Sequence, residues 1–199
     1  MQTLLRRLAA LGIALAALFS LFPCQTHAVS TSASSAILMD VDSGRVLYEQ
    51  NADAKMLIAS TTKILTALVA IREGDLNDVV TVSREAAYTE GSSMYLKVGE
   101  KLTLETLLYG LLLCSGNDAA VAIAEHISGS QEDFAKLMNA TAREIGMEHS
   151  SFANPNGLDH EDHYSTARDM ARLACVAVEN ETLVRMASTR SVTIGGRTM

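Results

Sequence analysis

Residues 60–74 read STTKILTALVAIREG, and the rest of the chain can be placed around this stretch. After its first four residues the segment is apolar on nearly every side of a helix. A helix with so little polar surface is buried. Gly74 stands where a helix commonly ends, as a C′ residue. We therefore expect a central, buried helix that begins near Ser60 and stops at Gly74.

Ser60 and Lys63 open this predicted helix and form the only Ser-x-x-Lys pair in the chain. Residues three apart share a helix face, so the amine of Lys63 can reach the hydroxyl of Ser60. A neutral lysine amine can take the proton of a serine hydroxyl and make it a nucleophile. Burial and the positive end of the helix dipole both lower the pKa of such a lysine. Ser60 is therefore the candidate nucleophile, and Lys63 is its candidate general base.

Ser115-Gly116-Asn117 forms a second polar group, between apolar helical segments at residues 103–113 and 118–127. A short loop between helices can point its side chains inward. Ser115 could then relay a proton to a leaving group, and the amide of Asn117 could orient both Lys63 and a substrate carbonyl. Taken alone, the tripeptide favours an ordinary turn.

The flanking segments predict strands at both ends of the chain and helices between them. Residues 36–40 and 45–48 read as a hairpin, and residues 191–194 read as the start of another strand. Further helices are expected after the capping box at residues 130–133 and from Thr166 to about residue 178. This order predicts an α/β (α+β) layered domain, because a lone hairpin is only marginally stable in water. We expect its sheet to be completed by strands that follow the given sequence.

Length, composition and charge restrict the class of protein. The 199 residues allow one domain of ordinary size, with 48% apolar and 20% charged residues, as in globular proteins. The formal net charge is −7, and no cluster of Lys and Arg occurs beyond Arg6-Arg7. Trp is absent and aromatic residues make up 5%, so platforms for stacking bases are scarce. These features argue against nucleic acid as a partner.

Residues 1–28 have the pattern of a secretory signal peptide. Arg6-Arg7 precede an apolar run at residues 8–22, and small residues lead to Ala28. A run of about 15 residues is short for the roughly 20 that span a bilayer, although an uncleaved membrane anchor is the alternative. We expect export to the periplasm or the bacterial cell surface, cleavage after about Ala28, a tether at residues 29–35 and a domain over residues 36–199.

The two polar groups and the sequence around them resemble the serine D-alanyl-D-alanine carboxypeptidases, which are low-molecular-weight penicillin-binding proteins. The resemblance runs from about Ala36 to the end of the chain and keeps the order and spacing of several motifs. These motifs are residues 58–67 (IASTTKILTA), 91–94 (GSSM), 98–100 (VGE), 111–120 (LLLCSGNDAA), 154–158 (NPNGL) and 163–167 (HYSTA).

The resemblance implies a β-lactamase/penicillin-binding transpeptidase-like fold, with an antiparallel sheet flanked by helices and a helical subdomain. It implies that Ser60 attacks the bond between the terminal D-alanines of a peptidoglycan stem peptide, in cell-wall biogenesis. Lys63 would act as general base, Ser115 would relay a proton to the leaving D-alanine, and Asn117 would bind substrate. Water would hydrolyse the acyl-enzyme, β-lactams would acylate the same Ser60, and neither a metal nor an organic cofactor would be required. Membrane attachment would come only from an anchor beyond Met199.

One motif of the family, Lys-Thr-Gly or Lys-Ser-Gly, is absent from the chain. In the family, the strand that carries it binds the substrate carboxylate and supplies an oxyanion donor. Losing one such donor typically costs about 10²–10³ in rate. We therefore expect the chain to be the N-terminal part of the catalytic domain, with the C-terminal sheet strands missing. Residues 29–199 alone should be inactive and poorly folded, and measurable acylation of them by a β-lactam would contradict this.

Three other functions are weighed against this one. A class A β-lactamase shares the Ser-x-x-Lys pair and would need a loop glutamate, such as Glu161, for fast deacylation. A non-catalytic peptidoglycan-binding relic would account for the absent Lys-Thr-Gly motif. A metallopeptidase is suggested by Asp159-His160-Glu161-Asp162-His163, but this cluster lacks helical i, i+4 spacing and is expected to be a solvated loop.

Overall fold

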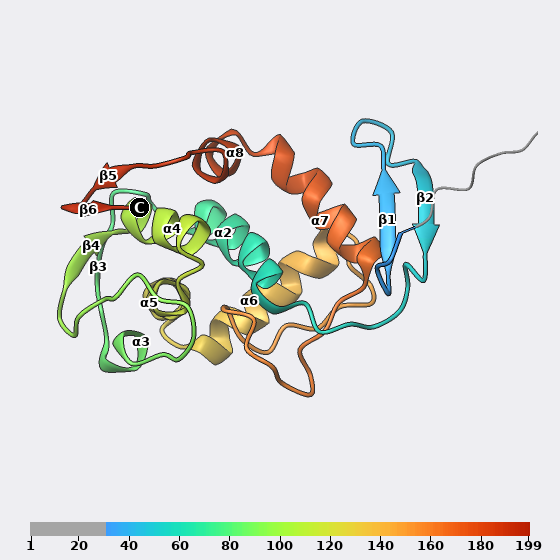
Figure 1. The fold of residues 1–199 in the computed structure, drawn as a ribbon. Helices are drawn as coiled ribbons and strands as arrows, with labels where there is room; N and C mark the ends of the chain where they lie inside the picture. The colour runs from blue at the N-terminus through green and yellow to red at the C-terminus, as the bar shows by residue number, and fades with distance from the viewer. Residues whose placement is uncertain (1–30) are drawn as a thin grey trace, which may run out of the picture. The chain divides into compact units, whose positions relative to one another are not determined.

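The computed structural model describes residues 31–199, and residues 33–199 form one unit. The predicted signal peptide, its cleavage after Ala28 and the first residues of the predicted tether lie outside the described residues. Within the unit, helices occupy the centre and short antiparallel strand pairs lie at the margins (Figure 1). The α+β class expected from the sequence is confirmed. Among residues 31–199, no helix is both long and apolar enough to cross a membrane.

The predicted central helix is α2 (Thr62–Glu73), which follows a 3₁₀ turn, η1 (Ala59–Thr61). Its apolar side chains are buried, and Leu65, Leu68 and Val69 are each at most 1% exposed. Burying side chains of this size stabilises the fold by about 1.5–3 kcal/mol each. The helices that surround it are α4 (Leu104–Leu113), α5 (Asn117–Ser128), α6 (Gln131–Glu144), α7 (Ala167–Glu179) and α8 (Glu181–Ala187).

Gly74 follows the last residue of α2, but it does not adopt the left-handed conformation expected of a C′ glycine. Its φ is −111°, in the extended region. A Cβ at this position would lie 2.5 Å from Cδ2 of Leu104 and 3.1 Å from the carbonyl oxygen of Ala70. A side chain at position 74 would therefore require Leu104 to shift, because α4 packs closely against the end of α2.

Local capping sets the starts of three other helices. The hydroxyls of Thr103, Ser130 and Thr166 each accept a hydrogen bond from the backbone N–H three residues later, at 3.2, 3.0 and 3.1 Å. Such caps typically contribute about 1 kcal/mol each. At the other end of α5, Gly129 has a φ of 80° and closes the helix in the left-handed conformation. These termini agree with the prediction.

The strands of the described residues form three two-stranded antiparallel pairs. The pairs are β1 (Ala36–Met39) with β2 (Val46–Gln50), β3 (Val79–Thr81) with β4 (Lys101–Thr103), and β5 (Thr193–Ile194) with β6 (Arg197–Thr198). The hairpin β1–β2 matches the prediction, and α7 is the covering helix that it requires (Figure 1). β3, β4, α8 and the four-residue helix α3 (Arg84–Ala87) were not predicted.

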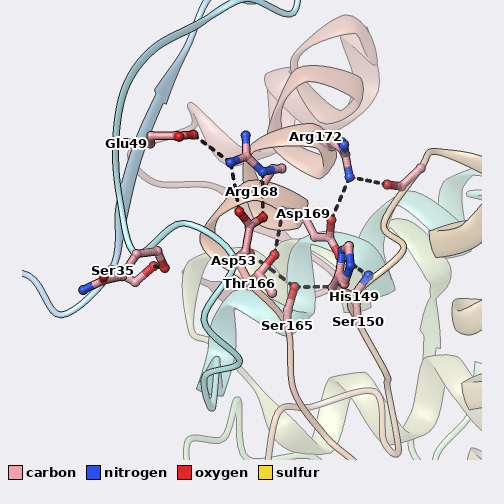
Figure 2. Close-up of polar contacts among 12 residues, drawn as sticks. Ser35, Glu49, Asp53, His149, Ser150, Ser165, Thr166, Arg168, Asp169 and Arg172 are labelled. Atoms are coloured by element: carbon pink, nitrogen blue, oxygen red, sulfur yellow. Dashed lines mark hydrogen bonds and ion pairs between the residues drawn. The ribbon is translucent and has the colours of Figure 1, made fainter.

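Hydrogen bonds and ion pairs link the start of α7 to neighbouring segments (Figure 2). Arg168 donates to both carboxylate oxygens of Asp53, at 2.7 and 3.0 Å, which ties α7 to the residues after β2. Asp169 is fully buried and accepts from the backbone N–H of His149 at 2.7 Å and from the hydroxyl of Ser150 at 2.8 Å. The long loop between α6 and α7 is thereby anchored at both of its ends.

Candidate active site

Ser60 lies in η1, directly ahead of α2, and it is exposed. Ala59 before it has a φ of 45°, in the left-handed region that residues with side chains rarely adopt. Conformations of this kind cost about 1–3 kcal/mol and persist only where the surrounding structure imposes them. Gly157 packs tightly here, because a Cβ on it would lie 2.0 Å from the carbonyl oxygen of Ala59. The loop that carries Gly157 thus helps to set the backbone that presents Ser60.

Lys63 extends from the first turn of α2 and is only 3% exposed. Its Nζ lies 3.1 Å from Oγ of Ser60, 2.7 Å from Oδ1 of Asn117 and 2.6 Å from the carbonyl oxygen of Asn156. Burial lowers the pKa of Lys63 from 10.5 to about 8. The structure therefore brings together Ser60, Lys63 and Asn117, as the sequence predicted.

The partners of Lys63 decide which way a proton can move. The carbonyl oxygen of Asn156 can only accept a hydrogen bond. The amide of Asn117 is oriented by its own donation from Nδ2 to the carbonyl oxygen of Glu90, at 2.7 Å, so that its oxygen faces Lys63. A neutral amine that donates two N–H groups to these acceptors has one lone pair left. In the structure Nζ of Lys63 also donates to Oγ of Ser60. In the neutral form, with its two N–H groups on Asn117 and Asn156, the lone pair would be left for Ser60, whose hydroxyl is the one partner of the three that can donate.

The N-terminus of α5 is bonded to residues 90–96. The backbone N–H of Asn117 donates to the carbonyl oxygen of Ser92 at 2.7 Å. Asp118 is fully buried and accepts from the hydroxyl of Ser93 at 2.6 Å. It also accepts from the backbone N–H groups of residues 94 and 96, at 3.1 and 3.0 Å. These bonds place Asn117 beside the Lys63 amine.

Ser115 lies on the turn between α4 and α5, two residues before Asn117. It is half-buried and has a φ of 54°. Within the part of the chain that the structure describes, its hydroxyl makes no hydrogen bond. Ser115 therefore adjoins the site through its place in the chain, without a direct bond to Ser60 or Lys63.

Two residues behind the site were not assigned a role in it from the sequence. Asn156 accepts from Lys63 through its backbone carbonyl, and His163 lies 2.8 Å from the hydroxyl of Thr62. Both fall within motifs that carry the family resemblance, at residues 154–158 and 163–167. The position of these residues in the family motifs was the only indication that the sequence offered, because any residue type can supply a backbone carbonyl as an acceptor.

The charged residues at 159–163 were weighed from the sequence as candidate metal ligands. Among residues 31–199, no group of three or more His, Cys, Asp and Glu side chains lies close enough to hold an ion. Asp159, His160, Glu161 and Asp162 are exposed, as expected of a solvated loop. His163 corrects that expectation: it is 1% exposed, because its ring is buried against Phe152 and Thr62.

Sequence comparison matches residues 23–194 to the family described as D-alanyl-D-alanine carboxypeptidase (Peptidase_S11). The carboxypeptidase DacF of Bacillus subtilis is 41% identical over 170 residues, which cover 83% of this chain and 44% of DacF. DacC of Escherichia coli is 44% identical over 158 residues, which cover 74% of this chain and 40% of DacC. The chain thus spans less than half the length of these curated relatives.

Solved structures give the same match. The D-alanyl-D-alanine carboxypeptidase from Mycobacterium tuberculosis H37Rv aligns with a TM-score of 0.82 and 33% identity, over 86% of this chain and 67% of that one. DacD from Francisella tularensis aligns with a TM-score of 0.77 and 37% identity, over 82% of this chain and 41% of that one.

Proposed function

The chain belongs to the D-alanyl-D-alanine carboxypeptidase family, and from this premise we propose that it carries the acylation centre of a serine-type D-Ala-D-Ala carboxypeptidase. The enzyme removes the terminal D-alanine from peptidoglycan stem peptides through an ester on Ser60. The observation that carries the proposal is the set of three partners around Nζ of Lys63, of which only Ser60 can donate a proton.

The proposed reaction begins when Lys63 takes the proton of Ser60 and Oγ of Ser60 attacks the carbonyl carbon of the penultimate D-alanine. The positive end of α2 stabilises the negative charge that develops on the carbonyl oxygen. Ser115 relays the proton that Lys63 took from Ser60 to the departing amine of D-alanine, which returns Lys63 to its neutral form; the unbonded hydroxyl of Ser115 leaves it available for that step. Asn117 holds Lys63 and presents the second N–H of its amide to the substrate. Water then hydrolyses the ester, with Lys63 as the base.

The proposed partners are stem peptides that end in D-Ala-D-Ala, with β-lactams as inhibitors that acylate Ser60. This assignment places the enzyme in cell-wall biogenesis. It assigns no role to a metal or an organic cofactor. The domain bounds at residues 36–199, export directed by residues 1–28 and an anchor beyond Met199 stay predictions.

Labelling with a fluorescent penicillin tests the proposal on the full-length protein that the gene encodes. We expect one covalent adduct on the peptide that contains Ser60, and release of D-alanine from a synthetic peptide ending in D-Ala-D-Ala. Ser60→Ala should abolish both signals. Ser188→Ala, at an exposed serine at the end of α8, is the matched control and should retain them.

The same experiment separates the alternatives. Fast hydrolysis of the penicilloyl adduct would favour a β-lactamase, whereas a slowly hydrolysed adduct supports the carboxypeptidase. Glu161, which a β-lactamase would need close to the ester, is exposed and makes no hydrogen bond to Ser60 or Lys63. Absence of any adduct, combined with peptidoglycan binding that survives Ser60→Ala, would support a non-catalytic binding protein.

A further inference from the structure

His163 is buried behind the candidate active site and contacts two segments that are far apart in the sequence. Its Nε2 lies 2.8 Å from Oγ1 of Thr62, in the first turn of α2. Its Nδ1 accepts a hydrogen bond from the backbone N–H of Ala153, at 3.2 Å. The ring of Phe152 stands edge-on to the imidazole, with the ring centroids 5.7 Å apart and the planes at 87°.

These contacts define the protonation state of the ring. The backbone N–H of Ala153 can only donate, so Nδ1 of His163 must carry a lone pair. The single proton of the neutral ring is then on Nε2, which donates to the hydroxyl oxygen of Thr62. Burial lowers the pKa of His163, with a smaller lowering from His160 and an opposing effect of Asp159. The neutral ring with its proton on Nε2 is the form that can make both bonds.

The two bonded segments are those that hold the Lys63 amine. Thr62 immediately precedes Lys63 on α2. Ala153 opens the short loop whose residue Asn156 accepts from Lys63 at 2.6 Å. The same loop is bonded a second time to α2, where the hydroxyl of Thr66 donates to the carbonyl oxygen of Pro155 at 2.6 Å.

We propose that His163 is a positioning residue for acylation: its neutral imidazole ties Thr62 to Ala153 and so keeps the Asn156 carbonyl on the Lys63 amine. With that acceptor in place, the remaining lone pair of Lys63 is directed at Ser60. His163 does not touch the substrate in this role. The inference rests on the proposed function of Ser60 and Lys63.

Three substitutions of His163 separate its two bonds. His163→Phe keeps most of the ring volume and removes both bonds. His163→Asn keeps an acceptor near the position of Nδ1, and His163→Gln keeps a donor near the position of Nε2. We expect His163→Phe to lower the rate constant for acylation by penicillin about 10- to 100-fold, the size of loss that a displacement of about 1 Å produces. Asn and Gln should each restore part of that rate.

The measurement must distinguish a slower acylation step from a general loss of protein stability. Acylation of the full-length protein is measured under single-turnover conditions, which separate the non-covalent affinity from the rate constant of ester formation. The loss should fall on the rate constant, because His163 leaves the substrate surface unchanged. Leu173→Ala, in the buried core of α7, is the control: it should lower the melting temperature and leave acylation unchanged well below that temperature. The ¹⁵N spectrum of the ring should show a proton on Nε2.

Each outcome bears on a separate claim. If the wild-type protein forms no adduct on Ser60, the proposed function fails. If the wild-type protein is acylated and folded His163→Phe is acylated at the same rate, only the positioning role is overturned. If His163→Phe does not fold, Thr62→Val decides, because it removes the hydroxyl from the other side of the same bond. A reduced acylation rate in Thr62→Val supports the inference, and an unchanged rate overturns it.

Discussion

The acylation rate should rise with pH, bend near pH 8 and level off above it, because only the neutral amine of Lys63 can take the proton of Ser60. Burial lowers the pKa of this lysine to about 8. With that pKa, the neutral fraction is about 1% at pH 6, about half at pH 8 and about 90% at pH 9. The acylation rate constant should therefore increase about 90-fold between pH 6 and pH 9. A lysine with a pKa of 10.5 would instead give a rise that continues beyond pH 9 without a bend.

The assay is single-turnover acylation of the full-length protein by a fluorescent penicillin, measured in steps of half a pH unit. Circular dichroism at each pH shows that the protein stays folded over the range. Lys63→Arg is the control, because a guanidinium keeps its proton throughout. Its rate should be about 10²–10⁴-fold lower, the usual contribution of a general base, and independent of pH. A wild-type rate that is flat from pH 6 to pH 9, or that still rises tenfold per unit at pH 9, would refute this reasoning.

Three further predictions concern stability. Gly157→Ala should lower the melting temperature and slow acylation, because the new Cβ would lie 2.0 Å from the Ala59 carbonyl oxygen. Gly99→Ala is the control, since φ is also positive there but no atom would lie within 4 Å of the new Cβ. It should lower the melting temperature less and leave acylation unchanged. Asp118→Ala leaves three backbone N–H groups without their acceptor and should lower the free energy of unfolding by about 2–5 kcal/mol in urea titrations. A loss below about 1 kcal/mol would contradict this. The folded state holds Lys63 at a lower pKa than the unfolded state, so the unfolded state binds more protons between pH 8 and 10.5. Stability contributed by this group should therefore rise with pH over that window, and a Lys63→Met variant should lack this rise.

Local patterns were sufficient for the elements whose determinants lie within a few residues. The Thr103 and Ser130 hydroxyls cap their helices through bonds to the backbone three residues later. The turn between β1 and β2 likewise needs only its own short polar sequence. β3 and β4 escaped prediction because three residues are too few to show an alternating pattern. The end of α2 at Gly74 was predicted, but the close approach of Leu104 to this position was not, because Leu104 belongs to another helix.

The contacts of the candidate site likewise fall into two kinds: one that the local sequence predicts and others that depend on tertiary packing. The contact between Ser60 and Lys63 follows from the primary structure, because residues three apart meet on any helix. The two acceptors of the amine come from Asn117 and Asn156, 54 and 93 positions along the chain, and tertiary packing alone places them. The fold also turns His163 inward from a loop of charged residues to bond α2. A local pattern cannot reveal such contacts, because they depend on which segments the buried core brings together and, at Asn156, on a carbonyl that every residue possesses.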